Sequence, residues 1–221
     1  MNLDVIGLGA LNMDNLYRVD RILDDGEAVV NEVISTPGGS AANTIYGLAR
    51  LGLSAGFIGV VGNDADGKLL IKDFQQVGVD TSHIKVKHRA QTGSVLCLSD
   101  RRGKRALYVR PGANNRLSWD DIDLAYLDRA RMLHVSSFVH DQQFRMTQEL
   151  VARLGAATSL SFSPGTLYVS RGLTALIPIL ARTHILFLNH REIRQLTGED
   201  VVAGTEVCLR QGCRTIVVTL G

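Results

Sequence analysis

Short apolar runs alternate with amphipathic segments along most of the chain. The apolar runs are bounded by Gly, Asn, Asp or Ser, as buried strands usually are; they occupy residues 5–8, 55–61, 132–135, 159–162, 185–188 and 215–220. Between them, apolar residues recur at helical spacing over residues 45–51, 70–77, 144–154, 173–180 and 202–209. Strands that alternate with helices predict an α/β fold, in which helices cover both faces of a mostly parallel sheet.

The pattern changes in two places. Residues 29–34 and about 80–116 contain short alternating runs, and the turn at 100–104 joins two of them. This pattern is typical of hairpins rather than of further strand–helix units. We therefore expect one α/β domain over residues 1–221, with a small second sheet built from about 15–36 and 80–116.

The last apolar run, Ile216-Val217-Val218, is typical of an interior parallel strand. Such strands are covered on both faces. No element follows Gly221 to cover this one, so we expect the sequence to be cut short at its C-terminus.

Composition narrows the function classes. The net charge is +2 and only 5% of residues are aromatic, which argues against nucleic acid or anionic lipid as a partner. The one basic cluster surrounds Gly103 and reads as a solvated hairpin tip, with a phosphate or substrate contact as the alternative; it comprises Arg101, Arg102, Lys104 and Arg105. The chain shows neither a signal peptide nor an apolar run of about 18 residues, so we expect a cytoplasmic protein without a membrane partner.

Cysteine, histidine and serine give little support to other chemistries. The three cysteines form no CxxC pair and fit neither a disulfide framework nor a zinc site. Cys97 lies in an apolar run and is most simply a core thiol. The histidines have no metal-binding spacing, and no serine lies in a Gly-x-Ser-x-Gly elbow.

Polar residues follow the first strand and the double glycine. A carboxylate such as Asp14, with Asn12 beside it, can clasp vicinal hydroxyls, although Asn-x-Asp after a strand is as often a turn or a helix cap. Gly38-Gly39 precedes a helix that contains Asn43. Glycines let a ligand approach the backbone and the helix N-terminus, and a tight strand-to-helix turn explains them equally well.

Two further features each have two interpretations. Asn189 and Glu192 open a helix after a strand, where they can hold hydrated Mg²⁺ and phosphate or form a capping box. Tyr108 and Arg110 share one face of the last strand of the insertion, where they either cover the sheet or, in the case of Arg110, bind an anionic substrate.

In order along the chain, these segments resemble the ribokinase-like sugar kinases, also called the PfkB family. The resemblance rests on residues 6–14, 37–43, 51–52, 57–64 with Gly67, 78–80, 111–114, 189–192, 196–198 and 217–221. It implies a ribokinase-like three-layer α/β/α sandwich with a mostly parallel central sheet and a small β-sheet lid, incomplete at the C-terminus. It also implies ATP-dependent phosphorylation of a sugar or nucleoside hydroxyl with Mg²⁺, and possible pairing of two lids in a homodimer.

The resemblance assigns roles to the candidate residues. The predicted substrate-binding residues are Asn12, Asp14, Gly38, Gly39, Asn43 and Arg110. Asn189, Thr219 and Gly221 are predicted to bind ATP, and Glu192 with Asn189 to hold Mg²⁺ through water. The lid would exclude water from the reaction.

The sequence departs from the family pattern at three points. The family's Gly-Ala-Gly-Asp segment, which carries the anion hole and the catalytic Asp, is not found up to Gly221. We therefore expect no catalytic base within this chain and no useful phosphoryl transfer from it alone; the alternative is a non-catalytic sugar- or nucleoside-binding protein or pseudo-kinase. Ser40 replaces a frequent Lys, and Ser163-Pro164 replaces Asp-Pro, which leaves the acceptor undefined.

Overall fold

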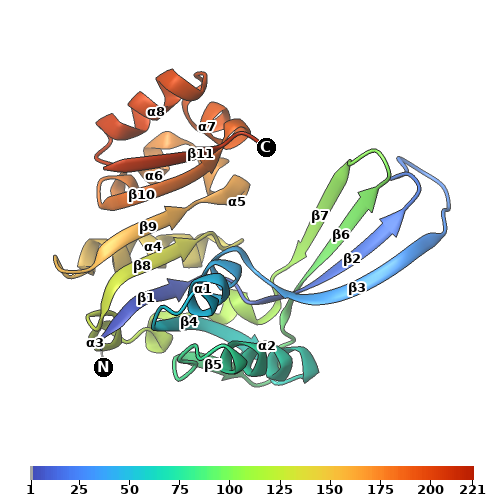
Figure 1. The fold of residues 1–221 in the computed structure, drawn as a ribbon, viewed down its shortest axis with the longest axis horizontal. Coiled ribbons are helices and arrows are strands. Elements are labelled where there is room, and N and C mark those ends of the chain that lie inside the picture. The colour runs from blue at the N-terminus through green and yellow to red at the C-terminus, as the bar shows by residue number, and fades with distance from the viewer. Residues whose placement is uncertain (1) are drawn as a thin grey trace.

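A parallel sheet of seven strands forms the centre of the molecule (Figure 1). The computed structural model describes residues 2–221. In spatial order the strands are β11 (Thr215–Thr219), β10 (Thr183–Asn189), β9 (Ser159–Ser163), β8 (Ala130–Ser136), β1 (Leu3–Leu8), β4 (Ala55–Gly62) and β5 (Ile84–Lys87). All neighbouring pairs run parallel, so the carboxyl ends of all seven strands meet at one rim.

Helices cover the sheet from two sides. α1 (Ser40–Arg50) and α2 (Ala65–Gln76) pack on one face, where Val5 and Phe57 lie in their apolar cluster. The helices on the opposite face enclose a second cluster with Ile6 and Leu8; they are α3 (Leu124–Leu127), α4 (Asp141–Arg153), α5 (Gly165–Val169), α6 (Leu173–Leu180), α7 (His190–Thr197) and α8 (Val201–Arg210). The predicted three-layer α/β/α fold is confirmed.

A second sheet of four strands projects away from this body (Figure 1). Its spatial order is β3 (Val30–Gly38), β2 (Asn12–Val19), β6 (Gly93–Asp100) and β7 (Arg105–Arg110). β2 runs antiparallel to β3 and parallel to β6, and β6 forms a hairpin with β7. The predicted small sheet therefore exists, and we call these four strands the lid.

The lid is narrower than the sequence indicated. Residues 80–116 were expected to belong to it as a whole, but β5 pairs in parallel with β4 at the edge of the central sheet. The short helix η1 (Gly112–Arg116) packs against the body, where Ala113 is fully buried, and η2 (Trp119–Asp121) follows it. Alternation alone cannot tell which sheet a short strand joins, because either sheet offers one apolar face.

The last strand lies at one edge of the described sheet. Residues 216–218 were expected to form a strand of the interior type that no later element covers or pairs, and β11 pairs only with β10 within residues 2–221. Val217 is 38% exposed, whereas Ile216 and Val218 pack against the core. The alternation of exposure along β11 is that of an edge strand with one covered face.

A glycine inside α1 provides a simple stability test. Gly47 lies in the middle of this helix, and a Cβ added there would meet no atom within 4 Å. Glycine disfavours a helix interior relative to alanine by about 0.5–1 kcal/mol, because the unfolded chain loses more freedom. We therefore expect Gly47→Ala to raise the free energy of unfolding by about that amount in a urea titration. A decrease would show that α1 is strained or packed differently.

None of the helices in the described part of the chain is long and apolar enough to cross a membrane.

Candidate functional site

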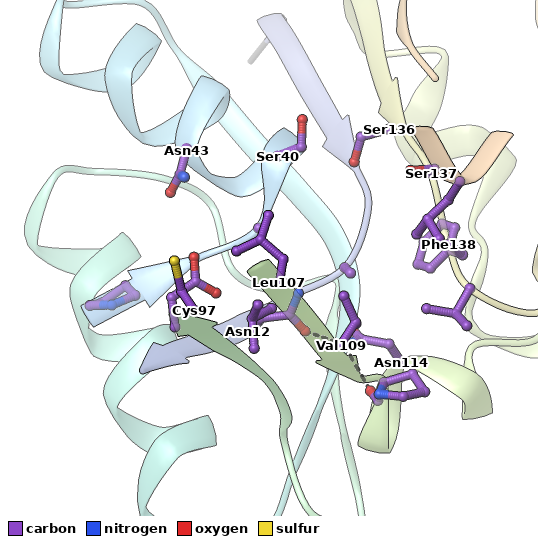
Figure 2. A pocket seen from close by; sticks show the side chains of 18 of the residues that line it. Asn12, Ser40, Asn43, Cys97, Leu107, Val109, Asn114, Ser136, Ser137 and Phe138 are labelled. Atoms are coloured by element: carbon purple, nitrogen blue, oxygen red, sulfur yellow. Dashed lines mark hydrogen bonds between the residues drawn. The ribbon is translucent and has the colours of Figure 1, made fainter. Parts of the chain in front are cut away.

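A cavity of about 590 Å³ lies between the lid and the carboxyl ends of β1 and β8. From the body it is lined by Ala10, Gly39, Ser40, Asn43, Asn114, Ser136, Ser137, Phe138, Val139 and Leu167. From the lid and its attachment it is lined by Asn12, Asp14, Leu16, Thr36, Pro37, Val95, Cys97, Arg105, Leu107, Val109 and Pro111. Figure 2 shows the labelled members of both walls facing one another. Among these residues Asp14 is the only acid and Arg105 the only base.

Asp14 places an unpaired carboxylate oxygen at this cavity. Its Oδ1 atom is buried and has no hydrogen-bond partner within residues 2–221. Burial raises the pKa of Asp14 above its usual value, because removal from water disfavours the charged form. Buried polar atoms are normally paired, so this oxygen is well suited to accept a hydrogen bond from a ligand.

The double glycine packs directly against Asp14 and the end of β1. A Cβ on Gly38 would overlap the carboxylate of Asp14, and a Cβ on Gly39 would overlap the carbonyl oxygen of Ala10. Gly39 also has φ 115°, a conformation that side chains rarely allow. Both glycines are therefore required by close approach, one to a side chain and one to the backbone.

The amino end of α1 opens into the same cavity. Gly39 provides no side-chain cap for this helix. The backbone N–H of Ala41 donates to Oγ of Ser136, 3.2 Å away, which links the helix to the end of β8. Ser40 and Asn43 are exposed in the first turn and line the cavity. Backbone N–H groups and amide side chains there suit hydroxyl or anionic oxygen atoms.

Asn114 organises the site, although it was not among the predicted site residues. It is 4% exposed, and its Nδ2 donates to Oδ1 of Asn12 at 2.9 Å and to the carbonyl oxygens of Leu11 and Pro111 at 3.0 Å each. Its Oδ1 accepts from the backbone N–H of Leu11 at 3.0 Å. Asn114 thus fixes the start of β2 to the body (Figure 2). Its place in the segment 111–114 was the available signal.

Removal of the Asn114 side-chain amide should destabilise the fold. We expect Asn114→Ala to lower the free energy of unfolding by about 2 kcal/mol, since it leaves the buried N–H of Leu11 without a partner. The same change removes the hydrogen bond to Asn12 and should lower the affinity of any ligand bound by Asp14. Chemical denaturation measures the first effect and calorimetry the second. Asn115→Ala, one residue along the same short helix, is the control; equal losses would contradict the assignment.

The inner lid wall is mostly apolar. Leu16 lies opposite Cys97, and Cys97 opposite Leu107. The neighbouring row towards the body contains Val95 and Val109. Cys97 is 4% exposed, and its sulfur faces the cavity in Figure 2. The predicted core thiol is therefore buried, and it also forms part of the cavity wall.

Arg110 lies outside this cavity. Side chains alternate across a strand, so Arg110 lies on the opposite face of β7 from Val109. Its Nε donates to Oγ of Ser94 at 3.2 Å and its Nη1 to Oε1 of Gln91 at 2.9 Å. The structure thus favours the interpretation in which Arg110 covers the sheet. The arginine that lines the cavity is Arg105, which belongs to the basic cluster interpreted as a solvated hairpin tip.

The predicted nucleotide residues lie on the same rim but further along it. Asn189 ends β10 and is paired in register with Thr219 at the end of β11. β10 is three strands from β1, or about 14 Å at the usual spacing of strands. Neither these residues nor Glu192 and Gly221 line the cavity. The rim therefore holds two groups of candidate residues side by side.

Asn189 and Glu192 form the capping box that was one of the two readings. Oδ1 of Asn189 accepts from the N–H groups of Arg191 and Glu192, both at 2.9 Å. Oε2 of Glu192 accepts from the N–H of Asn189 at 2.9 Å. Residues 2–221 contain no cluster of three His, Cys, Asp or Glu side chains that could hold a metal. The capping-box interpretation is therefore realised in the structure.

Comparison with known proteins decides the family. The family described as "pfkB family carbohydrate kinase" matches residues 2–221. The chain belongs to the PfkB family of carbohydrate kinases. The resemblance carried by the ordered motifs is thus confirmed.

Individual relatives agree with this assignment. An uncharacterized sugar kinase of Archaeoglobus fulgidus is 33% identical over 79% of the chain, which spans 70% of that relative. An ATP-dependent ribose-1-phosphate kinase of Halopiger xanaduensis is 33% identical over 89% of the chain, which spans 64% of it. The structure of Arabidopsis thaliana ribokinase complexed with ribose and ATP has a TM-score of 0.82 at 22% identity; the match covers 100% of this chain and 73% of that one. At that identity the last comparison shows the fold.

Proposed function

We propose that this PfkB-family chain binds a sugar or nucleoside as the acceptor for ATP-dependent phosphorylation. The observation that carries the proposal is the buried, unpaired Oδ1 of Asp14 at the cavity. A carboxylate accepts hydrogen bonds from two hydroxyls, and Asn12, Asn43 and the backbone at Gly38–Gly39 supply further polar groups around it. The cavity lining combines polar and apolar side chains, so it suits a ligand that has hydroxyls at one end and an apolar face.

We assign the nucleotide to the neighbouring part of the rim. Asn189, Thr219 and Gly221 would contact ATP, and Glu192 would contact Mg²⁺ through water. ATP supplies the phosphoryl group, and Mg²⁺ neutralises its charge. The names of two compared proteins include ATP, which supports this donor. A cytoplasmic location and pairing of two lids belong to the same proposal.

The chain by itself is proposed to bind without efficient phosphoryl transfer. Asp14 is the only carboxylate in the cavity lining, and we assign it to hydroxyl binding, so a general base has to come from elsewhere. Kinases typically turn over about 1–100 times per second. A purified chain that phosphorylates a sugar or nucleoside at such a rate would refute this part of the proposal.

Calorimetry tests the acceptor assignment. The chain should bind at least one member of a panel of pentoses, hexoses, nucleosides and ribose 1-phosphate, and Asp14→Asn should remove that binding. Asp20→Asn is the matched control, because Asp20 is an exposed lid carboxylate paired with Arg101. Mg²⁺ with a non-hydrolysable ATP analogue should change the acceptor affinity. Acceptor binding without any nucleotide effect would favour the non-catalytic binding protein.

A further inference from the structure

The inner face of the lid changes in character from its base to its tip. Strand register places Asp14 in one row with Val95 and Val109. The next row towards the tip contains Leu16, Cys97 and Leu107. In the third row Ser99 lies between Arg18 and Arg105, and Arg18 lies opposite Glu32. Successive rows on one face are two residues apart, or about 7 Å, so the Asp14 and Arg105 rows are separated by about 13 Å along the strands. The face thus presents a carboxylate, then an apolar row, then a row that holds the Arg18–Glu32 ion pair and Arg105.

Arg105 differs from the two nearby arginines that form ion pairs. Arg18 pairs with Glu32 at 2.9 Å, and Arg101 pairs with Asp20 at 2.9 Å. Within residues 2–221 no ion pair or side-chain hydrogen bond engages Arg105, and its side chain lines the cavity. A guanidinium stays charged at all relevant pH values and offers a planar set of donors that match phosphate and carboxylate oxygens.

Charge decides where an anionic part of the ligand would lie. The amino end of α1 is the other group in the cavity that suits an anion, but Gly38, two residues before its first residue, packs against the carboxylate of Asp14. An anion there would meet the charge of Asp14 at short range. At Arg105 it meets a cation, and Glu32, the acid of that row, is paired with Arg18. The hydroxyl end of a ligand therefore belongs at Asp14 and an anionic end towards Arg105.

We propose that the acceptor is an anionic sugar, such as a sugar phosphate, and that Arg105 binds its anionic group. This rests on the proposed function, since it presumes that Asp14 clasps the acceptor hydroxyls. It makes Arg105 a specificity-determining residue, which separates phosphorylated acceptors from their neutral parents. The apolar row between the two ends contacts the carbon skeleton.

The test compares matched ligand pairs by calorimetry at constant ionic strength. The pairs are ribose with ribose 1-phosphate, ribose with ribose 5-phosphate, and fructose with fructose 6-phosphate. We expect at least one phosphorylated member to bind about tenfold tighter than its parent, as a charged hydrogen-bonded contact allows. Arg105→Ala should abolish that difference and leave the affinity of the parent sugar unchanged; Arg105→Lys should keep part of it.

Arg102→Ala is the control for general electrostatics. Arg102 lies in the exposed turn just before β7 and does not line the cavity. Its removal therefore changes the lid charge equally and should leave the preference intact. Equal losses in the Arg102 and Arg105 variants, or parents that bind as tightly as the phosphates, would overturn the inference. If neutral sugars bind in an Asp14-dependent manner without any effect of Arg105, the proposed function stands and this inference falls. If no ligand binds, both fall.

Discussion

Asp14→Asn is expected to weaken acceptor binding by at least about a hundredfold. The substitution keeps the shape of the side chain but replaces one accepting oxygen with an NH₂ group, which cannot accept from a hydroxyl. Each hydrogen bond to a charged group contributes about 1.5–3 kcal/mol. The loss of one such bond and of the charge on the other acceptor together corresponds to about two orders of magnitude in affinity. Titration calorimetry with the best-binding sugar measures the change directly.

The same substitution should leave the fold at least as stable as before. Asp14 has an unpaired buried oxygen and a raised pKa, so its charged form destabilises the folded state at neutral pH. That penalty disappears as the pH falls through the raised pKa towards the usual 3.8, because the folded protein then holds a proton more tightly than the unfolded chain. Acceptor binding should weaken over the same pH window. A less stable Asp14→Asn protein would mean that the carboxylate has a structural role.

Gly39→Ala is expected to lower the free energy of unfolding by at least about 3 kcal/mol. The backbone of Gly39 has φ 115° and ψ 132°, a region that costs a residue with a side chain about 1–3 kcal/mol. The new Cβ would also overlap the carbonyl oxygen of Ala10, which is backbone and cannot rotate away. Relief requires movement of the junction between β3 and α1, and therefore of the lid.

Gly52→Ala is the matched control for that prediction. Gly52 also has a positive φ, of 92°, but a Cβ there would meet no atom within 4 Å. Gly52→Ala should lower the free energy of unfolding only by the cost of the left-handed backbone conformation, about 1–2 kcal/mol. Urea titrations of both variants separate strain from overlap. Equal destabilisation would show that the approach of Gly39 to Ala10 is not required.

Much of the architecture could be predicted from the sequence because apolar periodicity follows burial directly. The alternation of strands and helices gave the parallel sheet, and Asp14 with Gly38–Gly39 could be placed at its carboxyl rim. The strand at 84–87 was misassigned because its four residues alternate equally well in either sheet. Length and periodicity define a strand, but pairing partners are decided by contacts distant in sequence.

Side-chain roles were harder to predict than elements. Arg110 and Arg105 differ by five positions, so they lie on opposite faces of β7, and the sequence did not say which face meets the cavity. Asn114 acts through four hydrogen bonds to three other residues, a role that no local pattern reveals. For Asn189 and Glu192 both readings rest on the same spacing, and the structure shows the cap.

The anchoring of β2 by Asn114 has a mechanical consequence. Asn12 is fixed to the body and Asp14 lies only two residues beyond it, whereas Arg105 belongs to the far end of the same sheet. A rotation of the sheet about its attachment displaces each atom in proportion to its distance from the pivot. A small angular swing would therefore carry Arg105 through several times the path of Asp14. During such a rotation the contacts of Asp14 with the hydroxyls of a bound ligand would stay nearly unchanged. The distance from Arg105 to the other end of the ligand would change.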